Sequence, residues 1–310
     1  MIMQTMLALV LLGSLSAAAE GTYTNPVIDE IGPADPTVIL FEGVYYLYPT
    51  GDNVSYHVYT SRDLVHWVKG GKVFEPGPRG VWAPDVFRDP NDGKFYLYYT
   101  VNQRIGVAVA NRPDGTFVDR ARFYRNAIDA HMFRDDDGQY YLYYVQLPGF
   151  HIHVQRMKTP LERMGEPVEI LHPTEPWEKL RGDVTEGPWM LKHEGTYYLL
   201  YSGTGANSLD YAIGYATAAK TTGPFTKYAG NPIVKRTETA FGPGHGCVVR
   251  DGAGKLWSVY HQQKDDTEEW NRFICIDPLW FDDEGVLHGK ATRGTPEPAP
   301  VPLTSGTPSK

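Results

Sequence analysis

The chain has 310 residues, of which 42% are hydrophobic and 21% charged, which excludes a disordered or fibrous protein and allows a sizeable core. Lys and Arg number 29 against 37 Asp and Glu, and the net charge of −8 argues against nucleic acid or an anionic membrane as the main partner, because both bind basic faces. The 21 Tyr, 32 Gly and 24 Pro favour short strands and tight turns, so the composition predicts an all-β fold.

Residues 1–19 read as a signal peptide. An apolar stretch from Met6 to Leu12 is followed by the small residues Ala17, Ala18 and Ala19, which suit a signal-peptidase site. The apolar stretch is far shorter than the roughly 20 residues of a membrane-spanning helix. We therefore expect a secreted or periplasmic protein.

Five later segments share one design, and each predicts a β-hairpin. A polar residue opens an apolar strand, a glycine forms the turn, and a hydrophobic pair, aromatic in four of the five, begins the return strand. The segments are Asp35–Tyr48, Asp85–Tyr99, Asp129–Tyr144, Glu186–Tyr201 and His245–Tyr260. The turn glycine follows the opening residue by 8 or 9 positions every time, so we expect the opening residues to occupy one structural place.

A further strand-like stretch follows most hairpins, which makes a unit of three or four strands. The opening residues lie 50, 44, 57 and 59 positions apart, which is typical of propeller blades with loops. The chain is therefore predicted to form a single five-bladed β-propeller over residues 20–293. We expect residues 23–28 to add an outer strand that helps to close the ring, and residues 294–310, rich in Pro and Thr, to form a flexible tail.

The only two cysteines are Cys247 and Cys275, which excludes a disulfide scaffold and a Cys-rich metal site. Both lie within apolar, strand-like runs. They could pair in an oxidising compartment, but buried free thiols are the commoner outcome at such positions.

The opening residues indicate where chemistry takes place. If each one opens the innermost strand of its blade, Asp35, Asp85, Asp129, Glu186 and His245 form a ring at one mouth of the central channel. One such Asp alone often caps a turn, but four carboxylates at equivalent places indicate shifted pKa values, a bound cation or proton chemistry. Two facing carboxyl groups, one protonated and one ionised, are the equipment for glycoside hydrolysis.

Tryptophans accompany the acidic residues. Four of them lie in or beside loops near the opening residues, where an indole could stack on the apolar face of a sugar, although each alone is more typical of core packing. They are Trp82, Trp177, Trp189 and Trp270.

These motifs resemble the blade motifs of glycoside hydrolase family 43. The resemblance spans about residues 23–289 and depends on the order of the motifs, with Asp, Asp and Glu opening the first, third and fourth repeats. The motifs are Ala34-Asp35-Pro36-Thr37-Val38, Trp82-Ala83-Pro84-Asp85-Val86, Ile128-Asp129-Ala130, Thr185-Glu186-Gly187-Pro188-Trp189 and Gly242-Pro243-Gly244-His245-Gly246.

The resemblance implies an inverting hydrolase. In that mechanism Asp35 is the general base that activates water, Glu186 is the general acid, and Asp129 tunes the pKa of the acid and orients it. The apolar residues after Glu186 independently favour its protonated form. Inversion requires room for a water, so we expect the carboxyl groups of Asp35 and Glu186 to lie roughly 6.5–9.5 Å apart.

The remaining site residues are expected to bind substrate. They are Trp82, Asp85, Trp189, His245 and Arg272, and the resemblance implies that the Arg272 guanidinium reaches substrate hydroxyls. In similar proteins the histidine of the fifth repeat lies near the channel axis, where it contacts a calcium ion or its water shell, or braces the acidic cluster. No cofactor is required for the chemistry, and a structural calcium near the axis is possible.

The substrate class follows from the same resemblance. After Asp129 the sequence Ala130-His131-Met132-Phe133 departs from the Pro and small residue of many members, which we expect to alter the shape of the pocket. The chain is too short for the carboxy-terminal β-sandwich of many xylosidases, which favours a single-domain, exo-acting α-L-arabinofuranosidase, with β-D-xylosidase next. Endo-arabinanase and galactan- or galactofuranose-directed activities, a non-catalytic carbohydrate-binding propeller and a calcium-stabilised scaffold are the alternatives.

Overall fold

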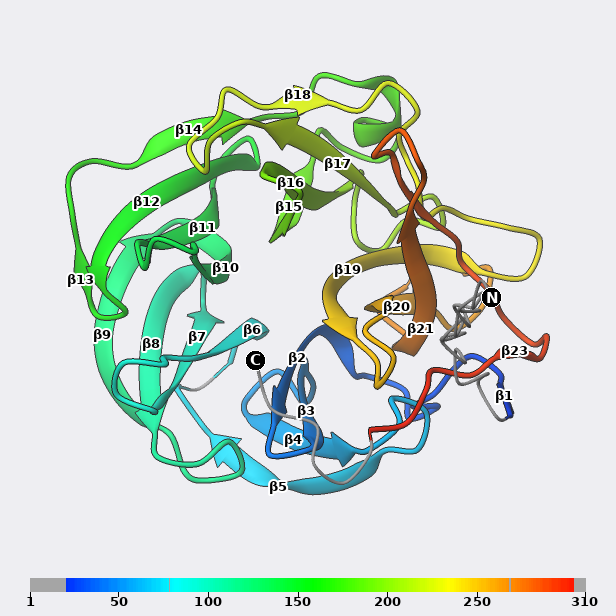
Figure 1. Ribbon diagram of the computed structural model, residues 1–310, viewed down its shortest axis with the longest axis horizontal. Coiled ribbons are helices and arrows are strands. Elements are labelled where there is room, and N and C mark those ends of the chain that lie inside the picture. Colours follow the sequence, from blue (N-terminus) through cyan, green and yellow to red (C-terminus); the bar gives the residue numbers. More distant parts are fainter. Residues whose placement is uncertain (1–20, 78, 268, 304–310) are drawn as a thin grey trace, which may run out of the picture.

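The computed structural model describes residues 21–77, 79–267 and 269–303, and nearly all their regular structure is β-strand. Five antiparallel sheets are arranged in a ring around a central axis (Figure 1). The only helical element in these ranges is one 3-10 turn, Pro176–Glu178. The described chain is thus a five-bladed β-propeller, as the repeats predict.

Each sheet is one blade, and its strands follow the chain order from the inside outward. The first blade contains β2 (Ala34–Phe41), β3 (Val44–Thr50), β4 (Tyr56–Ser61) and β5 (Val68–Phe74). The second contains β6 (Val81–Arg88), β7 (Phe95–Val101), β8 (Arg104–Ala110) and β9 (Val118–Arg125). The third contains β10 (Ala127–Arg134), β11 (Tyr140–Gln146), β12 (His151–Thr159), β13 (Glu162–Arg163) and β14 (Val168–Leu171).

The last two blades repeat the pattern. The fourth contains β15 (Thr185–His193), β16 (Thr196–Gly203), β17 (Ala212–Ala218) and β18 (Thr226–Lys227). The fifth contains β19 (Phe241–Arg250), β20 (Leu256–Gln263), β21 (Arg272–Phe281) and β22 (Leu287–Gly289). The five first strands, β2, β6, β10, β15 and β19, contact one another in turn around the axis (Figure 1).

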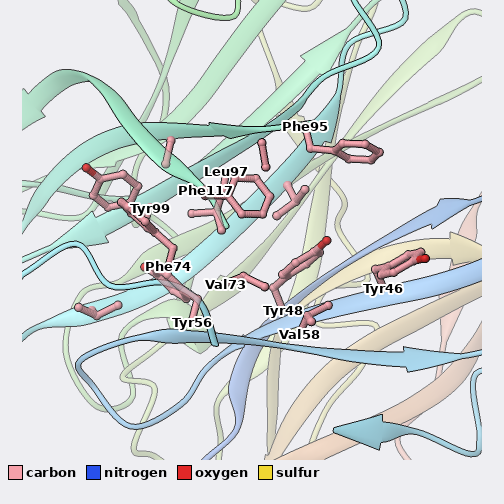
Figure 2. Packing of buried hydrophobic residues seen from close by; sticks show 14 of the residues in the cluster. Tyr46, Tyr48, Tyr56, Val58, Val73, Phe74, Phe95, Leu97, Tyr99 and Phe117 are labelled. Carbon is pink, nitrogen blue, oxygen red and sulfur yellow. The ribbon is translucent and has the colours of Figure 1, made fainter. Parts of the chain in front are cut away.

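The aromatic pairs of the sequence fill the spaces between blades. In β3, Tyr46 and Tyr48 belong to the cluster shared with the second blade, whereas Tyr45 and Leu47 belong to the cluster shared with the fifth. Successive side chains of a strand point to opposite faces, so a strand between two neighbours must be apolar at every position. Figure 2 shows the first of these clusters, where residues of β3 and β4 meet Phe95, Leu97 and Tyr99 of β7.

The amino-terminal segment helps to close the ring, but mostly through one side chain. Asn25 donates from Nδ2 to the Ile276 carbonyl at 2.7 Å and accepts the Ile276 N–H at 2.9 Å. Asn231 contacts Tyr215 in the fourth blade in the same way, at 2.8 and 3.0 Å. The repeated Asn-Pro motif is therefore a strand substitute, in which a side-chain amide satisfies the edge of the third strand.

The expected outer strand and flexible tail are both revised. Ile28 forms a single bridge with Ile274, while β1 (Thr22–Tyr23) pairs with β23 (Glu297–Pro298). The tail prediction is wrong for residues 294–303, since backbone groups of a Pro-rich segment can bond to the body without apolar periodicity. Val301 N–H donates to Asp251 Oδ2 at 3.1 Å, and Val301 O accepts from Gly252 at 2.8 Å.

Three other expectations concern the thiols and the ends of the chain. Cys247 and Cys275 are both free and buried, as their apolar surroundings predict. The described part of the chain contains no helix with the length and hydrophobicity of a membrane span. The predicted signal peptide and residues 304–310 lie outside the described residues.

Candidate active site

A β-bulge near the start of each innermost strand positions the site. In β2, Ala34 pairs with Thr50 and Thr37 with Tyr48, so two residues oppose one. The first bulge residue has a positive φ in every blade: Asp35 (47°), Ala83 (36°), Asp129 (57°), Gly187 (59°) and His245 (44°). Such a backbone costs non-glycine residues about 1 to 3 kcal/mol each, and strain of this kind is typical of functional sites.

The bulges correct the expectation that all five opening residues are equivalent. Asp35, Asp129 and His245 occupy the bulge position, but Glu186 precedes it by one residue and Asp85 follows it by two. The spacing from opening residue to turn glycine does not identify equivalent positions, because the loops between the first and second strands differ in length from blade to blade. Phe41 pairs directly with Val44, whereas Arg88 pairs with Phe95 across a longer loop.

Asp35 is an ionised carboxylate next to a buried arginine. The side chain is 7% exposed, and Arg272 Nη1 donates to Oδ1 at 3.2 Å. Burial opposes ionisation, but the charges of Arg272 and His245 and the hydrogen bond from His261 hold the pKa of Asp35 well below its ordinary 3.8. Arg272 dominates at neutral pH, since burial lowers the pKa values of both histidines and leaves them uncharged.

Glu186 and Asp129 behave in the opposite way. Burial raises the pKa of Glu186 to about 7 and, together with the negative charges of Glu186 and Asp35, raises the pKa of Asp129 well above its ordinary value. Tyr211 donates to Glu186 Oε1 at 2.8 Å, and the Gly187 N–H donates to Asp129 Oδ2 at 3.1 Å. Both shifts favour the protonated carboxyl group over the carboxylate.

Two histidines support the acidic residues. His245 Nδ1 lies 3.5 Å from Asp35 Oδ1 and 3.9 Å from Asp129 Oδ2, while its backbone N–H donates to Ser202 Oγ at 2.8 Å. Its ring lies against Gly187, where an added Cβ would come within 3.0 Å of Cγ, so only glycine fits. His261 is fully buried, with Nδ1 3.1 Å from Asp35 Oδ1 and 3.2 Å from the Asp35 backbone nitrogen, and burial together with Arg272 lowers its pKa to about 4.

A cavity of about 760 Å³ opens above these groups. It is lined by all three residues predicted to be catalytic, Asp35, Asp129 and Glu186, as well as by His245 and Arg272. Aromatic rings of Trp82, Phe150 and Trp270 form part of its wall. Trp270 is 61% exposed, and the Arg272 guanidinium carbon lies 5.2 Å from its ring centroid. A concave cavity of this size that combines aromatic rings with converging polar and charged groups is typical of a small-molecule site.

Two predicted binding residues lie elsewhere. Asp85 and Trp189 line a separate cavity of about 20 Å³, enough for about one water, with His131 between them. Asp85 accepts from Thr37 Oγ1 at 3.0 Å and from the Met132 N–H at 2.7 Å, and Trp189 stacks on His131 at 4.2 Å. Both are directed away from the large cavity because they follow the bulge by two residues.

The other two tryptophans singled out near the opening strands, Trp82 and Trp177, also lie in different places. Trp82 lines the large cavity, and its Nε1 donates to Asn53 Oδ1 at 2.9 Å. Trp177 is core packing, as its ring lies over Gly203 and Gly214. Sequence reasoning did not single out Tyr211 or His261, because both stand outside the repeated motifs and reach the site only when blades assemble.

The residues present do not form a direct calcium site. Within the described ranges, no group of three or more His, Cys, Asp or Glu side chains is arranged to hold a metal ion. Calcium prefers six to eight oxygen ligands, and Arg272 already neutralises the most acidic carboxylate of the cluster. No chemical step below depends on a metal.

The fold and the paired carboxyl groups define a glycoside hydrolase, and comparisons with known proteins identify its family. The family model for glycosyl hydrolases family 43 matches residues 23–287, so the chain belongs to that family. A crystal structure of a thermostable family-43 glycoside hydrolase superposes with a TM-score of 0.83 at 37% identity, covering 90% of this chain and 99% of the other.

Two curated relatives show a range of named activities. A β-D-galactofuranosidase of Aspergillus niger is 28% identical, covering 82% of this chain and 81% of the relative. A xylosidase/arabinosidase of Bacteroides ovatus is also 28% identical, covering 82% of this chain and 93% of the relative.

Proposed function

We propose that the protein is an inverting, exo-acting hydrolase of plant cell-wall polysaccharides or oligosaccharides. The terminal sugar is α-L-arabinofuranose or β-D-xylose, with arabinofuranose preferred. The observation that carries the proposal is the pair of opposite pKa shifts within one cavity, with Asp35 ionised at neutral pH and Glu186 protonated below its pKa of about 7. The name of the xylosidase/arabinosidase relative supports the choice of sugars.

The reaction is a single displacement. Ionised Asp35 accepts a proton from water, whose oxygen forms a bond to the anomeric carbon as the glycosidic C–O bond breaks. Glu186 gives its proton to the departing oxygen. Tyr211 holds Oε1 of Glu186, which assigns the proton transfer to Oε2. The roughly 6.5–9.5 Å separation of the two carboxyl groups stays a prediction of this mechanism.

Supporting residues set the charge states. Arg272 keeps Asp35 ionised, and Asp129 shares a buried site with Glu186, where the ionisation of either carboxyl group disfavours the ionisation of the other. Trp82 and Trp270 provide apolar surface for sugar rings. These roles need no cofactor, and the apolar segment at residues 6–12 supports export to the periplasm or the medium.

The experiment uses purified mature protein with an aryl α-L-arabinofuranoside and an aryl β-D-xyloside. Proton NMR follows the anomeric configuration of the sugar as it is released. Release with inverted configuration from either substrate supports the proposal and ranks the two sugars. Retained configuration would contradict the mechanism, and release of neither sugar would contradict the substrate class.

A second candidate is a galactofuranosidase of the same mechanism. The Aspergillus niger relative bears that name and matches over 288 aligned residues. An aryl β-D-galactofuranoside in the same assay decides between the two, because the preferred sugar is the one with the highest kcat/KM.

A further inference from the structure

A second hollow of about 460 Å³ lies beside the catalytic cavity in the second blade. Three arginines line it: Arg79 before β6, Arg104 on β8 and Arg122 on β9. This volume lies in the range of small-molecule sites and is sufficient for one sugar residue. None of the sequence motifs or catalytic roles described above accounts for it.

The hollow concentrates positive charge in a chain whose net charge is −8. Arg104 lies directly opposite Arg125 in the β8–β9 pair, and like charges in that arrangement destabilise a sheet. Arg122 is paired with Asp119 at 2.9 Å. The side chains of Arg79 and Arg104 form no hydrogen bond or ion pair with any other described residue. Two guanidinium groups are therefore available to an anion.

The walls of the hollow are held by specific contacts. The Gly80 N–H donates to Asn53 Oδ1 at 3.1 Å, and the Asn102 N–H donates to the Gly80 carbonyl at 2.9 Å. The Arg122 guanidinium lies over the Tyr99 ring at 4.9 Å. A ligand would thus meet a formed surface, which lowers the entropic cost of binding.

The hollow adjoins the catalytic cavity directly. Trp82 lines both spaces. The turn between β7 and β8 also separates them, since Gln103 lines the catalytic cavity while Asn102 and Arg104 line the hollow. A substrate whose terminal sugar occupies the catalytic cavity can therefore extend a neighbouring substituent across Trp82.

We propose that this hollow binds a carboxylate carried by the substrate itself, as in a uronic acid residue next to the neutral sugar that is removed. Guanidinium groups bind carboxylates through paired, charge-assisted hydrogen bonds. The inference rests on the proposed function and narrows it to acidic polysaccharides. The enzyme would still remove a neutral sugar, while the arginines favour substrates that carry a carboxylate on a neighbouring residue.

The test compares xylotriose with the same trisaccharide bearing one glucuronic acid residue. Binding is measured by calorimetry on the full chain carrying Glu186→Gln, so that hydrolysis of either ligand is slow during the measurement. We expect the acidic ligand to bind at least about fivefold tighter at low salt, and the ratio to approach one at about 0.5 M NaCl. Equal binding of the two ligands at low salt would overturn the proposal.

Variants then assign the effect to the hollow. Replacing both free arginines (Arg79→Ala with Arg104→Ala) should bring the ratio to about one and leave xylotriose binding unchanged. A charge-matched control, Lys220→Ala with Lys235→Ala, removes two exposed charges in the fourth blade region and should leave the ratio intact. If the control variant lost the preference for the acidic trisaccharide to the same extent, or if the arginine variant kept it, the hollow would not be the carboxylate-binding site.

Free glucuronic acid distinguishes a carboxylate carried by the substrate from a free anion as the ligand of the hollow. It should bind at least about tenfold more weakly than the acidic trisaccharide, and equal affinity would mean a site for a free anion instead. The salt titration needs no arginine variant, so it decides the question even if that variant does not fold. Failure of the proposed function is seen in a different measurement, as absent release of sugar from aryl glycosides.

Discussion

Asp35 and Glu186 lie in one cavity and are equally buried, each 7% exposed, yet their pKa values move in opposite directions. The difference lies in their neighbours. Asp35 faces the guanidinium of Arg272, whereas Glu186 faces a tyrosine hydroxyl and shares its site with Asp129. Burial thus raises the cost of every charge, and the partner of each group decides whether the charge persists.

The largest expected effect comes from removing the protonated member of the pair. Glu186→Gln should lower kcat by about 10² to 10⁴-fold, since the leaving group then departs without a proton. Binding of substrate should change little. Steady-state kinetics with an aryl xyloside and a poorer alkyl leaving group measures both, with Glu284→Gln as an exposed control. A loss of kcat of less than tenfold with the alkyl leaving group would show that Glu186 is not the general acid.

Removing the charge beside Asp35 tests the other half of the comparison. Arg272→Ala should raise the pKa of Asp35, so the base becomes protonated at higher pH and the acidic limb of the kcat/KM profile moves upward. We expect a loss of about tenfold to 100-fold at pH 6, which Arg272→Lys should partly restore. An acidic limb that does not move would show that Arg272 does not control the ionisation of Asp35.

Asp129→Asn should shift the opposite limb. Asp129 and Glu186 share one buried site and each disfavours the ionisation of the other, so loss of the Asp129 carboxyl group should lower the pKa of Glu186 below about 7. Because Glu186 acts in its protonated form, the basic limb of the pH profile should move to lower pH. The basic limb of the kcat/KM profile measures the shift, and an upward movement would contradict the coupling between the two groups.

Tyr211→Phe should have a smaller effect of the reverse sign. The tyrosine hydroxyl stabilises the ionised form of Glu186, so its loss should raise the pKa of Glu186 and extend activity toward higher pH. We expect about half a unit to one unit, the scale of a single hydrogen bond to a charged group. A downward shift of the basic limb would contradict this role of the tyrosine.

The smallest expected effect is that of a chelator. Since both proton transfers use side chains, EDTA should leave kcat and both limbs of the pH profile unchanged. Assays before and after dialysis against EDTA provide the measurement, with calcium added back as the control. A loss of activity restored by calcium would show that the ion has a part in the acid–base pair.

Much of the fold could be predicted because its physical signals are local. The turn glycines and the paired aromatics recur in each repeat, and both follow from a blade packed on two faces, as Tyr45 and Tyr46 show. The part of the tail up to Leu303 could not be predicted, because it is held by backbone bonds to Asp251 and Gly252 that leave no pattern in composition.

The site was predictable only as far as the repeats remain in register. Asp35, Asp129, Glu186, His245 and Arg272 do meet in one cavity. Asp85 and Trp189 do not, since each follows the first bulge residue of its strand by two positions, and a shift along a strand changes which space a side chain reaches.

The amino-acid sequence by itself determined the five blades, their order and the identity of the acidic residues, because strand period and turn chemistry act between near neighbours in the chain. Only the tertiary structure decided which carboxyl group is ionised. That depends on Arg272, 237 residues away from Asp35 in sequence and 3.2 Å away in space, and on Tyr211 at Glu186. Electrostatic interactions depend on the distance between charges and on their burial, and both are set by the folded structure and not by the order of residues in the chain.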